Sequence, residues 1–193
     1  MFWKNLKKPF VCLAPMEGVT DIAFRQVVSE CGEPDVYFTE FVNVTGMFSR
    51  GSESVLMSLR KRAEEKKLIA QLWGTDVNDF RKATELVVEM GFAGVDVNMG
   101  CPVRKIVNKG SCSALINNPK LAREIINSVK EGANGRIPVS VKTRIGFSEI
   151  VTEKWIRFLL ESGIDALTIH GRTAAEESRV PCHWDEIGKA VKI

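Results

Sequence analysis

The sequence predicts an α/β fold, a (β/α)8 barrel of which the 193 residues would form about six βα units. Six short apolar and β-branched runs alternate with helical patterns, which is typical of parallel βα units. The first run is not followed by the Gly-rich turn of a dinucleotide-binding sheet. Polar side chains gather near the carboxyl ends of the runs, where barrel enzymes place their active sites.

The six runs define the expected strands. They cover residues 11–14, 35–40, 68–73, 94–98, 139–144 and 166–170. The average spacing is about 32 residues, which is ordinary for a strand, a crossover helix and two loops.

Capping residues mark the helices between these strands. Asn118-Pro119 supplies an N-cap followed by proline at the first helical position, and Gly132 is expected just past the end. The next helix carries an apolar stripe around Trp155 and Leu159 and is expected to stop at Gly163. A final helical pattern begins at Trp184 and runs to Val191.

The choice between a barrel and an open sheet depends on the end of the first strand. It continues as Ala14-Pro-Met-Glu-Gly18 without a GxGxxG turn, which favours a barrel. A flavodoxin-like open sheet fits the same alternation of elements. If the fold is a barrel, residues 1–193 form one partial catalytic domain and two βα units lie outside it.

Composition narrows the class of protein. With 45% hydrophobic and 26% charged residues, no apolar run near 18 residues and no signal-peptide pattern at Met1, we expect a cytoplasmic protein without a membrane segment. Five cysteines form no CxxC pair and there are two histidines, so reduced thiols and no metal site are expected. The net charge of +3 is too small to indicate nucleic-acid binding by itself.

Alternation within the strands places polar side chains on one face. Val139 and Val141 share one side of their strand, while Lys142 and Arg144 share the other. An inward cation at the base of a barrel would be very costly, whereas at the mouth it is a ligand group. The same argument turns four further side chains inward: Asp96, Asn98, Thr168 and His170.

Each of these residues also has a plain structural interpretation. A lone Lys near a strand end is usually solvated, a lone His is usually structural, and a lone Cys is usually a small buried hydrophobe. Cys101, however, follows a strand end and precedes Pro102 in a loop of the kind that carries function. The convergence on one rim favours a site made of Gln71, Asn98, Cys101, Lys142 and His170.

Several segments resemble the tRNA-dihydrouridine synthase family, in the family's order and over nearly the whole chain. The most specific is Asn98-Met-Gly-Cys-Pro102, and the APMxGVTD-like opening at 14–21 is shared with other FMN barrels. The other matching stretches are Phe24-Arg25, Thr39-Glu40, Ala70-Gln-Leu-Trp-Gly74, Lys109-Gly110, Val141-Lys-Thr-Arg-Ile-Gly146 and Ile169-His-Gly-Arg-Thr173.

The resemblance implies bound FMN, reduced by NADPH, and reduction of the C5–C6 double bond of uridines that are flipped out of tRNA. Cys101 would protonate C5 while hydride passes from flavin N5 to C6, and an ordinary thiol pKa near 8.5 is expected for this acid. Flavin contacts are implied for Pro15, Met16, Gln71, Lys142 and His170, and uracil contacts for Asn98 and Arg144.

The resemblance also leaves parts of the family pattern outside this chain. The last two βα units, with their phosphate grip, and a helical C-terminal tRNA-binding domain are expected beyond residue 193. Residues 173–183 depart from many bacterial members. Two other hypotheses remain: an FMN barrel acting on a free pyrimidine or another small molecule, and an inactive or merely RNA-binding fragment.

Overall fold

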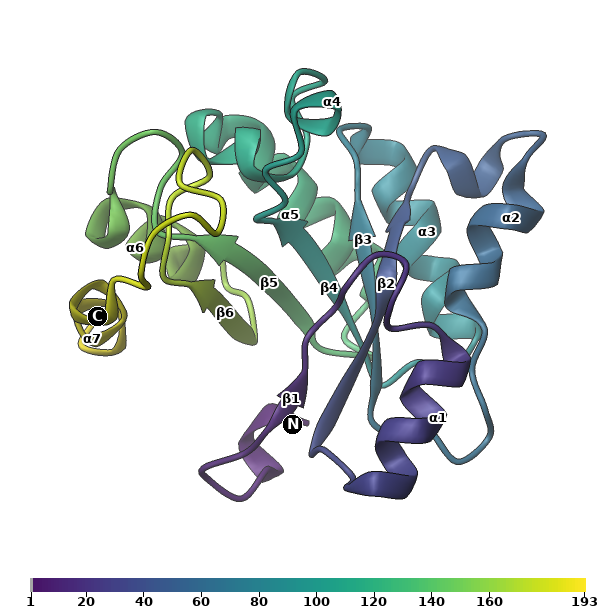
Figure 1. Ribbon diagram of the computed structural model, residues 1–193. Helices are drawn as coiled ribbons and strands as arrows, with labels where there is room; N and C mark the ends of the chain where they lie inside the picture. The colour runs from purple at the N-terminus through teal and green to yellow at the C-terminus, as the bar shows by residue number, and fades with distance from the viewer. Residues whose placement is uncertain (1) are drawn as a thin grey trace.

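The computed structural model describes residues 2–193 and contains one parallel sheet. The sheet curves with helices along its outer side (Figure 1). Its strands are β1 (Cys12–Leu13), β2 (Val36–Asn43), β3 (Leu68–Trp73), β4 (Gly94–Met99), β5 (Val139–Arg144) and β6 (Ala166–His170). Its α-helices are α1 (Ile22–Cys31), α2 (Ser52–Leu56), α3 (Val77–Glu89), α4 (Arg104–Val107), α5 (Pro119–Ala133), α6 (Thr152–Glu161) and α7 (Trp184–Val191).

The strand order decides between the two topologies left open by the sequence. The strands are paired in parallel in the order β1-β2-β3-β4-β5-β6, so each strand lies beside its successor. A flavodoxin-like sheet would place its first strand between the second and third. The sequential order is that of a (β/α) barrel, and six strands form its half-barrel part.

Three predicted strands differ from the structure in their limits, and the change is smallest in β4, which ends at Met99 and not at Asn98. β2 continues to Asn43 through a register shift between Phe38 and Phe41, which a pattern of simple alternation does not reveal. β1 is only two residues long, since it is an edge strand that pairs with β2 alone.

The valines of β4 and β5 face the helices, as the alternation predicted. Val95, Val97, Val139 and Val141 are almost wholly buried in the main hydrophobic cluster, together with residues of α3 and α5. The polar residues between them therefore lie on the concave face. Burial of this apolar set fixes which face of each strand is available for chemistry.

Helix α5 starts where predicted but ends later. Asn118 caps it by accepting a hydrogen bond from the Leu121 amide, and Pro119 is its first residue. The helix passes through Gly132 and ends at Ala133, and its C-cap Asn134 adopts the left-handed conformation. A Cβ on Gly132 would lie 2.6 Å from the Arg81 carbonyl oxygen of α3. Gly132 thus allows α3 and α5 to approach closely, and it does not mark the end of α5.

A buried ion pair joins α1 to the segment before β3. The Arg25 guanidinium is fully buried and donates to the Glu65 carboxylate from Nε at 2.7 Å and from Nη2 at 3.2 Å. It also donates to the carbonyl oxygens of Thr20 and Arg60. Because these bonds run both to the loop after β1 and to the segment before β3, Arg25 holds that loop against the body of the protein.

No helix among residues 2–193 is long and apolar enough to cross a membrane.

Replacing Arg25 with methionine should lower the free energy of unfolding by about 3–5 kcal/mol, because Glu65 would be left charged and buried without a partner. Denaturant titration followed by circular dichroism measures this. The matched control is Arg157→Met, which breaks the exposed Arg157–Glu153 pair and should cost under about 0.5 kcal/mol. Equal midpoints for the two variants would contradict the assignment.

Candidate active site

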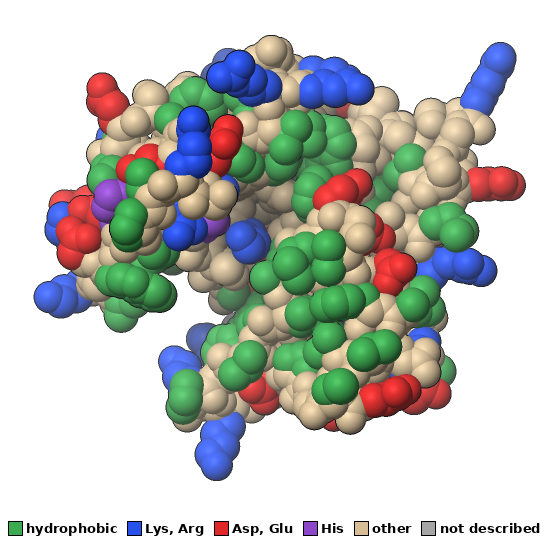
Figure 2. Space-filling model, in the orientation of Figure 1, with side chains coloured by type: hydrophobic (Ala, Val, Ile, Leu, Met, Phe, Trp, Pro, Cys, Tyr) green, Lys and Arg blue, Asp and Glu red, His purple; other side chains and the backbone are tan. Residues whose placement is uncertain are grey.

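A cavity of about 180 Å³ lies at the carboxyl ends of the strands. Figure 2 shows that this side of the molecule is hollowed, with Lys or Arg and His side chains beside the hollow. The cavity is lined by Pro15, Phe41, Gln71, Asn98, Gly100, Cys101, Pro102, Lys142, Arg144 and His170. Seven of the eight site residues expected from the sequence therefore come together here.

Met16 is the expected site residue that does not line this cavity. Its side chain is 38% exposed, and its backbone carbonyl and amide both bond to the Thr20 side chain in the loop after β1. Phe41 lines the cavity as well, although the sequence did not predict it. Its place follows from the register shift in β2, which has no clear sequence signal.

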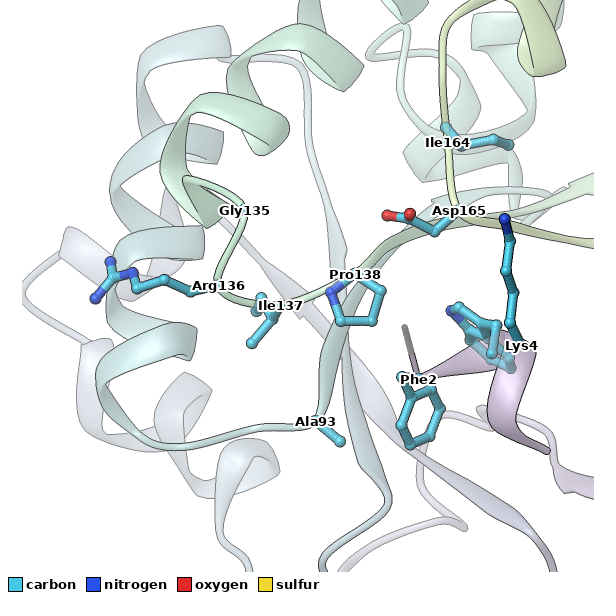
Figure 3. A pocket seen from close by; sticks show the side chains of 10 residues that line it. Phe2, Lys4, Ala93, Gly135, Arg136, Ile137, Pro138, Ile164 and Asp165 are labelled. Atoms are coloured by element: carbon cyan, nitrogen blue, oxygen red, sulfur yellow. The ribbon is translucent and has the colours of Figure 1, made fainter.

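A larger cavity of about 770 Å³ lies at the opposite end of the sheet, before β4, β5 and β6 (Figure 3). Its lining combines apolar side chains such as Phe2, Ile137 and Pro138 with the charged residues Lys4, Arg136 and Asp165. The carboxylate of Asp165 in its wall already accepts a hydrogen bond from the Val139 amide at 2.8 Å. The smaller cavity, where several polar groups converge, is the better candidate for catalysis.

A chain of hydrogen bonds runs beneath the small cavity. Gln71 donates from Nε2 to the Asp96 carboxylate at 2.7 Å, and Asn98 donates from Nδ2 to Gln71 Oε1 at 3.0 Å. Asn98 Oδ1 accepts from the backbone amides of Gly100 and Cys101, each at 3.0 Å. The strand interior is thereby connected to the loop that carries the thiol.

The loop after β4 places Cys101 beside a second thiol. The Cys101 carbonyl oxygen accepts from Ser113 Oγ at 2.9 Å, which holds the loop against the segment containing Cys112. Cys112 is fully buried and has a positive φ of 55°, a strained conformation for a residue with a side chain. Its thiol is hydrogen-bonded to the Cys101 sulfur.

The thiol pKa of Cys101 is not ordinary, contrary to the expectation from the sequence. The hydrogen bond from Cys112 is the largest cause that lowers the Cys101 pKa, which reaches about 6 against the opposing effect of burial. The Val103 amide and the positive charge of Arg144 lower it further. The same contact raises the pKa of Cys112, so the pair shares one readily lost proton.

Lys142 is half-buried and carries a charge opposite to that of the buried Asp96; it follows Ser140, the register partner of Asp96, by two residues along β5. Burial lowers the pKa of Lys142, and the Asp96 carboxylate opposes this. Burial raises the pKa of Asp96 to about 6, against hydrogen bonds from Ser140 and Gln71 and the charge of Lys142. Each group therefore helps its partner to remain charged at neutral pH.

His170 is held neutral in one tautomer. Arg172 Nη1 lies 3.0 Å from His170 Nε2, and because a guanidinium can only donate, Nε2 must accept and Nδ1 must carry the proton. Burial and the charges of Arg144, Lys142 and Arg172 lower the His170 pKa to about 4. The ring is a neutral N–H donor among three cations.

Arg144 ties together the two loops that border the cavity. Its Nε donates to the Gly100 carbonyl oxygen at 2.7 Å, beside Cys101. Its Nη1 donates to the carbonyl oxygens of Thr173 and Glu177, in the loop after β6. Its charge therefore stays at the rim, close to the thiol.

Among the described residues, no group of three or more His, Cys, Asp or Glu side chains is arranged to hold a metal ion.

Two curated relatives are similar to this chain over its whole length. Probable tRNA-dihydrouridine synthase 2 of Bacillus subtilis (strain 168) is 43% identical, and the match covers 100% of this chain and 59% of the relative. Probable tRNA-dihydrouridine synthase of Staphylococcus aureus (strain COL) is 46% identical over 99% of this chain and 58% of the relative. The chain thus spans less than three fifths of these relatives.

Solved structures support the fold alone, because they are only 13% identical. Morphinone reductase in complex with tetrahydroNAD matches with a TM-score of 0.55 over 83% of this chain and 69% of that chain. Histamine dehydrogenase from Rhizobium sp. 4-9 matches with a TM-score of 0.57 over 83% of this chain and 34% of that chain.

The family model described as dihydrouridine synthase (Dus) matches residues 12–192, which include every strand and the whole cavity described above. With the curated relatives, this match shows that the chain belongs to the dihydrouridine synthase family.

Proposed function

We propose that residues 1–193 carry the catalytic centre of an FMN-dependent, NADPH-driven tRNA-dihydrouridine synthase that works in the cytoplasm. The observation that carries the proposal is Cys101, an acidic thiol on a loop bordering a cavity with Lys142 and His170. The family match and the curated relatives name the reaction class. Two further βα units and a helical tRNA-binding domain would complete the enzyme beyond this chain.

The residues around the cavity fit the polar ring edge of a flavin. Lys142 offers a positive charge, while Gln71 and the neutral His170 offer N–H donors. This set of groups would stabilise an electron-rich reduced flavin. Pro15 would contact the ring, as would Met16 from the same loop. Bound FMN would supply the hydride for uracil C6 and would itself be reduced by NADPH.

The substrate would be a uridine extruded from tRNA, since a stacked base cannot reach the mouth of a barrel. Asn98 would hold the uracil edge together with Nη2 of Arg144, since the hydrogen bonds of Arg144 described above use its Nε and Nη1. Three exposed cations would contact phosphates: Arg104 and Lys105 in α4 and the neighbouring Lys109, on the loop that follows Cys101.

Cys101 would give its proton to C5 as hydride reaches C6, so that the C5–C6 double bond becomes a single bond. With a pKa of about 6, the thiol is a stronger acid than free cysteine, and only about one tenth of it is protonated at pH 7. Cys112, whose pKa is raised, keeps a proton next to the Cys101 sulfur. A pKa near the working pH favours general acid catalysis.

The activity is tested with the chain extended at its C-terminus by the part of the Bacillus subtilis relative that lies beyond the match. Purified protein with NADPH should bind FMN, absorb near 450 nm and form dihydrouridine in tRNA that lacks it. Turnover of a free pyrimidine but not of tRNA would replace the proposal with a small-molecule FMN dehydrogenase. A colourless protein that cannot be reconstituted with FMN would exclude both.

In this extended protein, Cys101→Ala should retain FMN and its reduction by NADPH while losing dihydrouridine formation by about 10²–10⁴-fold, because only the proton donor is removed. Stopped-flow absorbance separates flavin reduction from flavin reoxidation by tRNA. Cys31→Ala, which changes an exposed thiol at the end of α1, is the matched control. Loss of FMN in the Cys101 variant would give this residue a structural role.

The rate of flavin reoxidation by tRNA should rise as pH falls from 8 toward about 6, because the acid must be protonated to act. Cys112→Ala removes the main cause of the lowered Cys101 pKa and should move this limb of the profile to higher pH. Cys112→Ser keeps a donor and should leave the limb close to its original position. An unchanged profile in both variants would show that the Cys112 contact does not set the acidity.

A further inference from the structure

One buried carboxylate beneath the cavity has no part in the mechanism above. Asp96 lies on β4 and is fully buried. It stands in register with Gln71 on β3 and with Ser140 on β5, so the three side chains form one row across the sheet. Both neighbours donate to it, Gln71 Nε2 at 2.7 Å and Ser140 Oγ at 2.6 Å.

The carboxylate fixes the direction of the hydrogen-bond chain from one end. An ionised Asp96 carboxylate can only accept hydrogen bonds, so the Gln71 group that faces it must be the NH₂ group and not the carbonyl. Gln71 Oε1 must then point the other way, where it accepts from Asn98 Nδ2.

The opposite end of the chain imposes the same direction independently. The backbone N–H groups of Gly100 and Cys101 can only donate hydrogen bonds, so the Asn98 atom that faces them must be its side-chain carbonyl oxygen. Turning over either side-chain amide would bring two donors or two acceptors together. The two ends therefore allow a single arrangement of both amide groups.

We propose that Asp96 is a positioning residue that fixes Gln71 and Asn98 as hydrogen-bond donors toward the cavity. Each NH₂ group has a second N–H that this chain of bonds does not use, and both residues line the cavity. The ligands recognised are heterocycles that present carbonyl oxygens, as a flavin or a uracil does. This ligand assignment depends on the proposed function, while the fixed direction does not.

The negative charge of Asp96 also affects the protonation of Lys142, which lines the cavity. Burial lowers the pKa of Lys142 and the charge of Arg144 lowers it further, whereas Asp96 and, to a smaller extent, Cys101 raise it. Ser140 and Gln71 face the carboxylate from the neighbouring strands and carry no charge. The one carboxylate thus keeps the amides oriented and the lysine charged.

The orientation is tested by NMR on the 193-residue chain labelled with ¹⁵N-glutamine, because Gln26 and Gln71 are its two glutamines. Gln26 is the internal reference, since it donates to Glu30 in an exposed pair at 3.0 Å. We expect Gln71 side-chain protons to exchange roughly 100-fold more slowly than those of Gln26. The proton facing Asp96 should be shifted downfield and should titrate as pH passes through about 6.

Three variants separate orientation from charge. Asp96→Asn keeps an acceptor for Gln71 and should retain slow exchange while losing the titration. Asp96→Leu removes the acceptor and should lose both. Ser140→Ala is the matched control, which takes away one donor to the same carboxylate and should keep both signals. A Gln71 amide that exchanges as fast as Gln26 in the unmodified chain would overturn the proposal, with no need for any variant to fold.

The effect on the ligand is measured in the extended protein by FMN fluorescence titration. Asp96→Leu should weaken FMN binding by about tenfold, as expected for the loss of one oriented hydrogen bond in a buried site. Asp96→Asn should stay within about threefold and should lower the flavin midpoint potential through Lys142. A protected, titrating Gln71 in a protein without FMN binding would refute the proposed function and leave the orientation intact. Equal FMN affinity in the Asp96→Leu variant would overturn the assigned role toward the ligand.

Discussion

The parallel pairing of β4 with β5 is the constraint on which the candidate site depends. It sets Asp96 beside Ser140 and Asn98 beside Lys142. The valines that alternate with these residues are buried against the helices, so a shift by one residue would expose the valines and bury the polar set against apolar side chains. Burial of the valines on one face of the strands thus fixes the positions of the polar side chains on the other face.

Three cationic side chains at the carboxyl ends of the strands set the protonation of the histidine and the thiol beside them. Arg144 and Arg172 remain cationic, and together with Lys142 they keep His170 neutral and acting as a donor. Arg144 also favours the thiolate of Cys101. The result is a rim of positive character, with one acidic thiol on its edge, that suits an electron-rich ring or an anion.

Loops hold these groups in place through backbone contacts. Arg144 reaches the Gly100 carbonyl on one side and the loop after β6 on the other, so one side chain joins the two loops that border the cavity. The turn after β5 requires Gly146, because a Cβ there would lie 1.8 Å from the Glu149 carbonyl oxygen. Gly146 in turn accepts a hydrogen bond from the Ala174 amide. The neighbouring βα loops are therefore mutually dependent.

By itself the sequence determined the strands, their inward and outward faces and most residues of the site, because periodicity and capping are local properties. It also placed Cys101, Lys142 and His170 on one rim, since the carboxyl ends of parallel strands meet there.

Only the tertiary structure decided what depends on contacts between distant segments. It brought Cys112 to Cys101 and so lowered a thiol pKa expected to be ordinary, and it tied Arg144 to the loop after β6. It showed Gly132 to be a packing residue and connected Asp96 to the loop that carries Cys101, because close approach and hydrogen-bond direction arise only when the strands and helices are assembled.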